Sequence, residues 1–122
     1  MPPRSAHHDP ASAACRAADT SLVRAFGFLG KRWNAVVLGT LSHGPAGFRD
    51  LSRAIDGISD SMLSSRLADL TAAGLLVRTV DEGPPLAVSY ALTDRARALM
   101  PALDQISLWA QEHLPHDDPT KE

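Results

Sequence analysis

The sequence predicts a mainly helical domain with one β-hairpin, an α+β fold built on a single core. Apolar residues recur at three- and four-residue spacing in five segments, which is typical of amphipathic helices. Two Leu- and Val-rich runs flank an Asp-Glu-Gly-Pro-Pro turn, which indicates a hairpin. The 122 residues leave room for one domain, and 44% hydrophobic with 21% charged residues excludes collagen-like, coiled-coil-only and fully disordered chains.

The N-terminal region is predicted to divide near Asp19. Residues 1–18 contain several prolines and little that can anchor to a core, so they are expected to form a flexible arm that carries Cys15. Asp19 or Thr20 then caps a first helix that ends near Gly30. The apolar face of this helix consists of Leu22, Phe26 and Leu29.

Two further helices follow in quick succession. The second is predicted over 33–41, because Gly44-Pro45 cannot comfortably continue it. The third is short, covers 48–55, and is closed by Asp56-Gly57.

The fourth helix is predicted over 60–73. Ser59 suits its N-cap, and Ile58 can pack on Leu63 as a hydrophobic staple. Gly74 can adopt the left-handed conformation that ends a helix, which lets Leu75 pack back on the last turn. The buried face of this helix is expected to consist of Leu63, Leu67 and Leu70.

The hairpin strands are predicted over 75–80 and 86–92, and Thr93 or Asp94 caps the last helix. The domain is therefore expected to cover 19–114, with an acidic tail at 115–122. An apolar stripe on the last helix exceeds what a small domain needs to cover its own surface, which indicates dimerisation. The stripe consists of Leu103, Ile106, Trp109, Ala110 and Leu114.

Three helices followed by a hairpin are the order of a winged helix-turn-helix, with the helix over 60–73 as recognition helix. Its buried leucines turn small and polar side chains outward: Ser61, Ser64, Ser65, Ala68 and Ala72. Short side chains let a helix approach base edges in a major groove. The alternative is a solvated face, but serines are only moderate helix formers, so the DNA interpretation is favoured.

The candidate DNA-binding residues combine hydroxyls with cations that can meet phosphates. They are Arg49, Arg53, Ser59, Ser61, Ser64, Ser65, Arg66 and Arg78. The alternative for the arginines is surface ion pairing: Arg53 with Asp50 or Asp56, Arg66 with Asp69, and Arg78 across the hairpin.

Other functional classes find little support in the sequence. The net charge is −2, with a slight basic excess over 21–100 and an acidic excess over 101–122. One cysteine forms neither an internal disulfide nor a cysteine zinc site, and no phosphate loop or Gly-x-Ser-x-Gly motif occurs. No enzyme, cofactor or metal site is therefore expected. Without a long apolar run or secretory signal, we expect a cytoplasmic protein with no membrane partner.

Several segments together resemble the HxlR-type (MarR-like) family of bacterial transcription regulators, over about residues 15–114. They are Gly30-Lys31-Arg32-Trp33-Asn34, Phe48-Arg49-Asp50-Leu51, Met62-Leu63, Arg66-Leu67, Gly74-Leu75 and Tyr90-Ala91-Leu92-Thr93. The resemblance implies a homodimer, built by the first and last helices, that binds double-stranded DNA, usually as a repressor. The hairpin would be the wing, although Pro85-Leu86-Ala87-Val88 lacks the basic residue common in the family.

Cys15 resembles the N-terminal cysteine with which a branch of the family senses quinones, aldehydes or oxidants. A nearby helix N-terminus and Arg16 would favour its thiolate, whereas the alternative is an inert bystander. The predicted function is a homodimeric regulator of an inverted-repeat operator that responds to thiol-reactive or small-molecule signals. The alternative is a winged-helix protein-interaction module without DNA binding, which a pI near 6.2 would suit.

Overall fold

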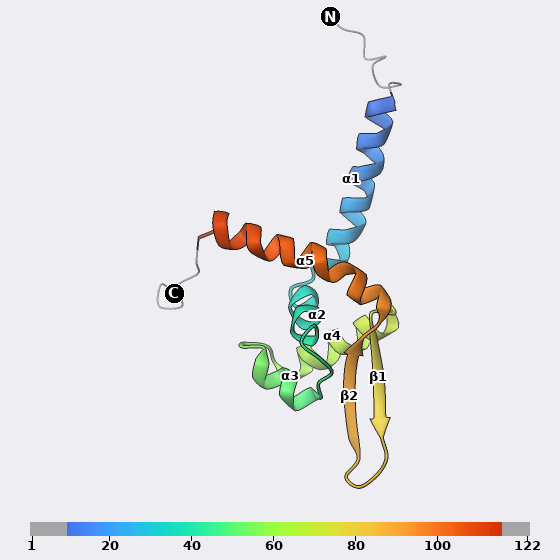
Figure 1. The fold of residues 1–122 in the computed structure, drawn as a ribbon, viewed down its shortest axis with the longest axis vertical. Helices are drawn as coiled ribbons and strands as arrows, with labels where there is room; N and C mark the ends of the chain where they lie inside the picture. Colours follow the sequence, from blue (N-terminus) through green and yellow to red (C-terminus); the bar gives the residue numbers. More distant parts are fainter. Residues whose placement is uncertain (1–9, 116–122) are drawn as a thin grey trace, which may run out of the picture.

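The computed structural model describes residues 10–115, with side chains from residue 20 onward. Residues 1–9 of the predicted arm and 116–122 of the predicted tail lie outside this range. Figure 1 shows helices packed beside one antiparallel hairpin, which confirms the predicted fold class. The elements are α1 (Pro10–Leu29), α2 (Asn34–Leu41), α3 (Phe48–Ala54), α4 (Asp60–Ala72), β1 (Leu76–Asp81), β2 (Ala87–Leu92) and α5 (Asp94–His113).

The first helix begins earlier than predicted. α1 starts at Pro10, so Asp19 lies inside the helix rather than at its N-cap. Residues 11–18 are rich in alanine, the strongest helix former, and proline is well tolerated at the first helical position. Cys15 therefore belongs to α1 instead of to an arm that precedes it.

The core lies where α2, α3 and α4 meet the base of the hairpin. Leu38 of α2, Leu51 of α3 and Leu63 of α4 are completely buried. The three leucines predicted for the buried face of α4 all belong to this core. Close packing of these side chains positions α4 and leaves its opposite face in solvent.

Both ends of α4 are capped as predicted. The Ser59 hydroxyl accepts a hydrogen bond from the Met62 amide at 3.1 Å. At the other end Gly74 has φ +81°, and the Leu75 amide donates to the Leu70 carbonyl at 3.0 Å. This pair of features is the Schellman motif, which satisfies carbonyls of the last turn.

The hairpin packs its base into the core and also pairs with the segment that precedes α3. Its strands pair in register from Leu76 opposite Leu92 to Asp81 opposite Ala87. Ala46, just before α3, exchanges two backbone hydrogen bonds with Tyr90, of 2.8 and 3.0 Å. The hairpin therefore stands beside the α3–α4 pair as the wing of a winged helix-turn-helix.

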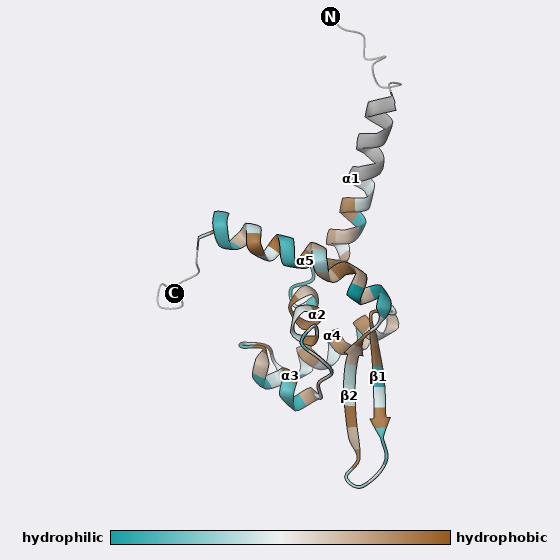
Figure 2. Cartoon of the chain, in the orientation of Figure 1, coloured by the Kyte–Doolittle hydropathy of each residue, from teal (hydrophilic) through white to brown (hydrophobic). Residues whose placement is uncertain are grey.

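α1 and α5 project from this body in different directions, and hydrophobic residues occur on the coloured part of α1 and along α5 (Figures 1 and 2). On α1, Leu22 is 55% exposed and Phe26 52% exposed, so the predicted apolar face is not buried by this chain. On α5, Trp109 is 54% exposed. None of the described helices combines the length and apolar character that crossing a membrane requires.

Candidate nucleic-acid interface

The α3–turn–α4 unit has the geometry of a helix-turn-helix. Gly57 takes φ +88° in the turn, a conformation that favours glycine. Ile55 and Ile58 on either side of it are buried, which anchors the turn to the core. The Ser52 hydroxyl also donates to the Asp60 carboxylate at 3.1 Å, which joins α3 to the first turn of α4.

The outer face of α4 carries short side chains and is open to solvent. Ser61, Ser64, Ser65, Ala68 and Ala72 are all exposed, as the spacing predicted. The opposite face holds Leu63, Leu67 and Leu70, none of them more than 1% exposed. The leucine face fixes α4 to the core, and the opposite face presents hydroxyl and methyl groups to solvent. Such short side chains allow a helix to approach the bases in a major groove of DNA closely.

Arg49 and Arg53 of α3 line a hollow together with Asp60, the first residue of α4. Arg49 is exposed, and no hydrogen bond or ion pair joins its side chain to another described residue. Arg53 pairs with Asp50 at 2.9 Å, with both side chains about two thirds exposed or more (71% and 67%), so the predicted alternative partner is present. An exposed pair of this kind contributes little to stability, which leaves Arg53 free to exchange Asp50 for a phosphate.

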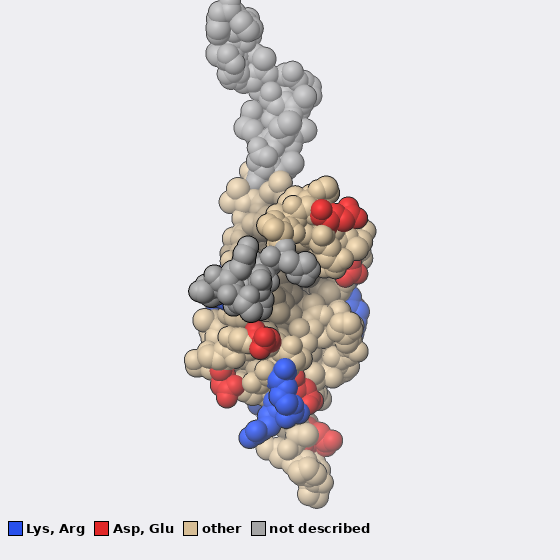
Figure 3. Space-filling view, turned by 90° about the vertical axis from the view of Figure 1, so that its left-hand side faces the viewer, with Lys and Arg blue, Asp and Glu red and all other residues tan. Residues whose placement is uncertain are grey.

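Seen from the side that carries α3, basic side chains form their largest cluster in the lower half of the molecule (Figure 3). Acidic side chains surround the cluster in the same view. On this face the positive surface is therefore a compact cluster among acidic side chains, in keeping with the small net charge of the chain.

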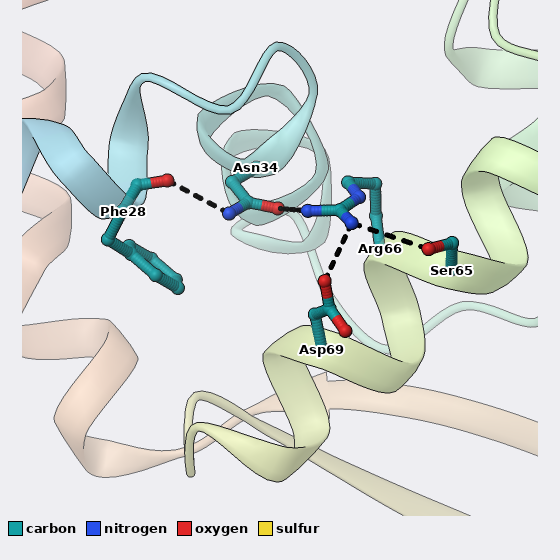
Figure 4. Close-up of polar contacts among 5 residues, drawn as sticks. All are labelled: Phe28, Asn34, Ser65, Arg66 and Asp69. Atoms are coloured by element: carbon teal, nitrogen blue, oxygen red, sulfur yellow. Dashed lines mark hydrogen bonds and ion pairs between the residues drawn. The ribbon is translucent and has the colours of Figure 1, made fainter.

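Arg66 differs from the other candidate arginines because its side chain is only 12% exposed. It donates to Asp69 at 2.6 Å, to the Ser65 hydroxyl at 3.3 Å and to the Asn34 side chain at 3.3 Å (Figure 4). The Asp69 pair is the alternative that the sequence predicted. Asn34 was missed, although a lone amide among the apolar residues of α2 is the signal that identifies it.

The wing carries few cations. Arg78 is exposed on β1 and lies opposite Tyr90, so the predicted cross-strand ion pair does not form. The loop at the tip contains the exposed acids Asp81 and Glu82. Any attraction between the wing and a phosphate backbone therefore depends on Arg78.

The remaining predicted residues lie away from α3 and α4. Cys15 is in α1, within the stretch whose side chains the structure does not describe. In the α5 stripe, Leu103 and Ala110 are half-buried, whereas Ile106, Trp109 and Leu114 are between 44% and 54% exposed. The structure thus separates the helix-turn-helix surface from the apolar surfaces of α1 and α5.

Comparison with known proteins agrees with this architecture. Residues 28–118 match the sequence profile described as HxlR-like helix-turn-helix. The chain is 37% identical over 89 residues to YvaP of Bacillus subtilis, an uncharacterised HTH-type transcriptional regulator, covering 73% of this chain and 82% of YvaP. It is 35% identical over 88 residues to the HTH-type transcriptional regulator YodB of Bacillus subtilis, covering 72% of this chain and 79% of YodB.

The solved structures point the same way. The reduced form of YodB from B. subtilis superposes with a TM-score of 0.70 at 33% identity, covering 80% of this chain and 96% of YodB. The oxidised form of the redox regulator HypR gives a TM-score of 0.72 at 26% identity, covering 80% of this chain and 99% of HypR. YodB has also been solved after diamide treatment and with a bound quinone. The match over most of the chain, together with the winged helix-turn-helix, shows that this protein belongs to the HxlR-like helix-turn-helix family of transcriptional regulators.

Proposed function

We propose that this regulator binds an inverted-repeat operator as a homodimer and acts as a repressor rather than as an enzyme. The observation that carries the proposal is the outer face of α4, which exposes short hydroxyl and methyl side chains while three leucines on the opposite face are buried. A helix held this rigidly can enter a major groove about 12 Å wide without rearrangement. The arginines of α3 flank it where phosphates would lie.

The proposed contacts divide between base edges and backbone. Ser61, Ser64 and Ser65 are exposed and can donate to or accept from either. Ser59 accepts from the Met62 amide and shares a 3.4 Å hydrogen bond with the Ser61 hydroxyl, and one of these two hydroxyls can donate instead to a phosphate at the N-terminal end of α4. The arginines proposed to bind phosphates are Arg49, Arg53 and Arg78.

Dimerisation is supported by the uncovered apolar surfaces of α1 and α5. Exposed Phe26 and Trp109 are expensive to leave in water, and a second copy would cover both. A twofold dimer would present its two α4 helices to successive major grooves about 34 Å apart.

We further propose that Cys15 makes DNA binding responsive to thiol-reactive compounds. YodB has been solved in reduced, diamide-treated and quinone-bound forms, and HypR is described as a redox regulator. The position of Cys15 in α1, a proposed dimer helix, would let modification of its thiol alter the relation between the two α4 helices. If so, Cys15→Ser binds DNA normally but no longer responds to diamide or a quinone.

A third proposal is that small molecules that do not react with thiols also regulate the protein by binding next to α5. A hollow of about 440 Å³ lies between α2 and α5. It adjoins one of about 500 Å³ between α5, the end of α2 and the end of β2, and both are lined by Ser42, Met100 and Asp104. A ligand there would touch a helix of the body and a proposed dimer helix together.

The test is binding of the reduced protein to a labelled fragment from upstream of its own gene, against random DNA, across a salt series. Specific binding with a steep salt dependence supports the proposal. Arg53→Ala is expected to lower the salt slope by about 0.9 for each phosphate that the variant no longer neutralises. Arg97→Ala is the matched control, because Arg97 forms a similar exposed pair with Asp94, at 2.8 Å, but lies on α5.

The result that contradicts the proposal is the absence of specific binding both to that fragment and to any sequence selected from random DNA. The protein-interaction alternative would then be favoured, in agreement with the small net charge and the acidic wing tip.

A further inference from the structure

A chain of polar contacts around one buried amide connects three helices (Figure 4). Asn34, at the start of α2, is 1% exposed and is the one buried polar residue among residues 20–115. Its amide nitrogen donates to the carbonyl oxygen of Phe28 in the last turn of α1 at 3.0 Å. Its oxygen accepts from Nη1 of Arg66 in α4 at 3.3 Å. Both ends of this single amide are therefore used to join other helices.

The guanidinium of Arg66 is turned inward. Its Nη2 donates to Asp69 and to the Ser65 hydroxyl, while its Nε is buried and has no partner among the described residues. Its side chain is 12% exposed, against 71% for Arg53, so it would have to leave Asn34 and Asp69 before it could reach a phosphate.

We propose that Asn34 and Arg66 are positioning residues that fix the orientation of α4 relative to α1 and α2, and that Arg66 does not bind a phosphate. This inference rests on the proposed function, since the orientation matters because α4 enters DNA. The four members of the chain are the Phe28 carbonyl, the Asn34 amide, the Arg66 guanidinium and the Asp69 carboxylate.

The different chemistry of arginine and lysine explains why the proposed role requires arginine at position 66. Guanidinium is a planar fork that reaches two acceptors in different directions, whereas an ammonium is a compact point charge on a flexible stem. Lysine at position 66 therefore keeps the charge but cannot hold Asn34 and Asp69 in the same geometry. A lysine in place of a phosphate-binding arginine, in contrast, remains a good phosphate ligand.

This difference gives the experiment. Arg66→Lys is compared with Arg97→Lys by measuring affinity for operator and random DNA across a salt series. Arg97 is the matched control, because it also pairs with an aspartate three residues away, Asp94, but lies exposed on α5. We expect Arg66→Lys to lower operator affinity about tenfold or more, the effect of losing a hydrogen bond to a charged group, with random-DNA affinity and salt slope unchanged. Arg97→Lys should leave all three quantities unchanged, because the Arg97–Asp94 pair lies on α5. If Arg66→Lys binds the operator like the wild type, or Arg66→Met lowers the salt slope by about 0.9 per protomer, the positioning role is refuted.

Asn34→Asp separates the two links of the chain. The new carboxylate still accepts from Arg66 but can no longer donate to the Phe28 carbonyl. We expect it to lower the ratio of operator to random-DNA affinity as Arg66→Lys does, at a temperature where thermal unfolding shows both variants to be folded. A reduced melting temperature with an unchanged affinity ratio would mean that the amide only stabilises the fold, and would overturn the proposal.

A measurement without DNA tests the orientation of α4 separately from the proposed function. Backbone residual dipolar couplings report the direction of α4 relative to α2 in the free protein. Arg66→Lys should change the couplings of α4 and Arg97→Lys should not. If the wild type binds no specific DNA, the proposed function fails while these couplings still decide the positioning role. Wild-type couplings in Arg66→Lys refute it.

Discussion

The uncovered side chain of Trp109 allows the proposed dimer to be tested quantitatively. Trp109 lies on α5 and is 54% exposed. An aromatic side chain buries up to about 250 Å², so covering the exposed part removes about 135 Å² from water. At about 25 cal/mol per Å², this is worth about 3 kcal/mol per protomer. In a twofold interface the residue counts twice, so Trp109→Ser can weaken association by up to about 6 kcal/mol, about four orders of magnitude in Kd.

The assay is sedimentation equilibrium over a range of protein concentrations. Leu86→Ser is the matched control, since Leu86 is even more exposed, at 69%, but lies in the loop of the hairpin. We expect a wild-type dimer at micromolar concentration, a monomer for Trp109→Ser and an unchanged dimer for Leu86→Ser. Equal dissociation constants for Trp109→Ser and the wild type would refute the assignment of α5 to the interface, as would a monomeric wild type.

Three further predictions concern the elements that hold α4. Ser59→Ala should lower the free energy of unfolding by about 1 kcal/mol in urea denaturation, because the Met62 amide loses its acceptor, whereas Ser59→Asp should retain the cap; equal midpoints for the two variants would contradict this. Gly57→Ala should cost about 1–2 kcal/mol through its left-handed backbone alone, since the added Cβ would lie 3.9 Å from the Trp33 ring; a stabilised variant in the same assay would exclude backbone strain. Leu67→Ala should cost about 2–5 kcal/mol, because the side chain is 1% exposed, and an unchanged melting temperature would show that the core is misassigned.

The helices and the hairpin were predictable because their signals are local. The cap residues Ser59 and Thr93 and the glycine at position 74 end or begin helices through contacts within a few residues of themselves. The start of α1 was not predicted, because Asp19 resembles an N-cap while the alanines before it favour continuing the helix. Two local signals competed there, and the propensity of the alanines prevailed.

The exposed face of α4 was predictable from the sequence, but the burial of Arg66 was not. The outward face of α4 follows from the spacing of its leucines alone. The burial of Arg66 does not, because its partner Asn34 lies 32 residues away and only the packing of α2 on α4 brings them together. Nor does the spacing of the apolar residues of α1 tell whether they are buried, and Leu22 and Phe26 are both more than half exposed.

The contacts at the C-terminal end of α4 affect the local unfolding of the protein. The Thr93 hydroxyl donates to the Gly74 carbonyl at 2.8 Å, and Arg95 donates to the Ala73 carbonyl at 3.2 Å. Groups at the start of α5 thus satisfy carbonyls at the end of α4, so fraying one helix deprives the other of its partners. The two should behave as one cooperative unit in native-state hydrogen exchange, with amides of the last turn of α4 and the first turn of α5 opening together. A disturbance that loosens α5 is therefore transmitted to α4 as a change in local stability, even where no helix moves as a rigid body.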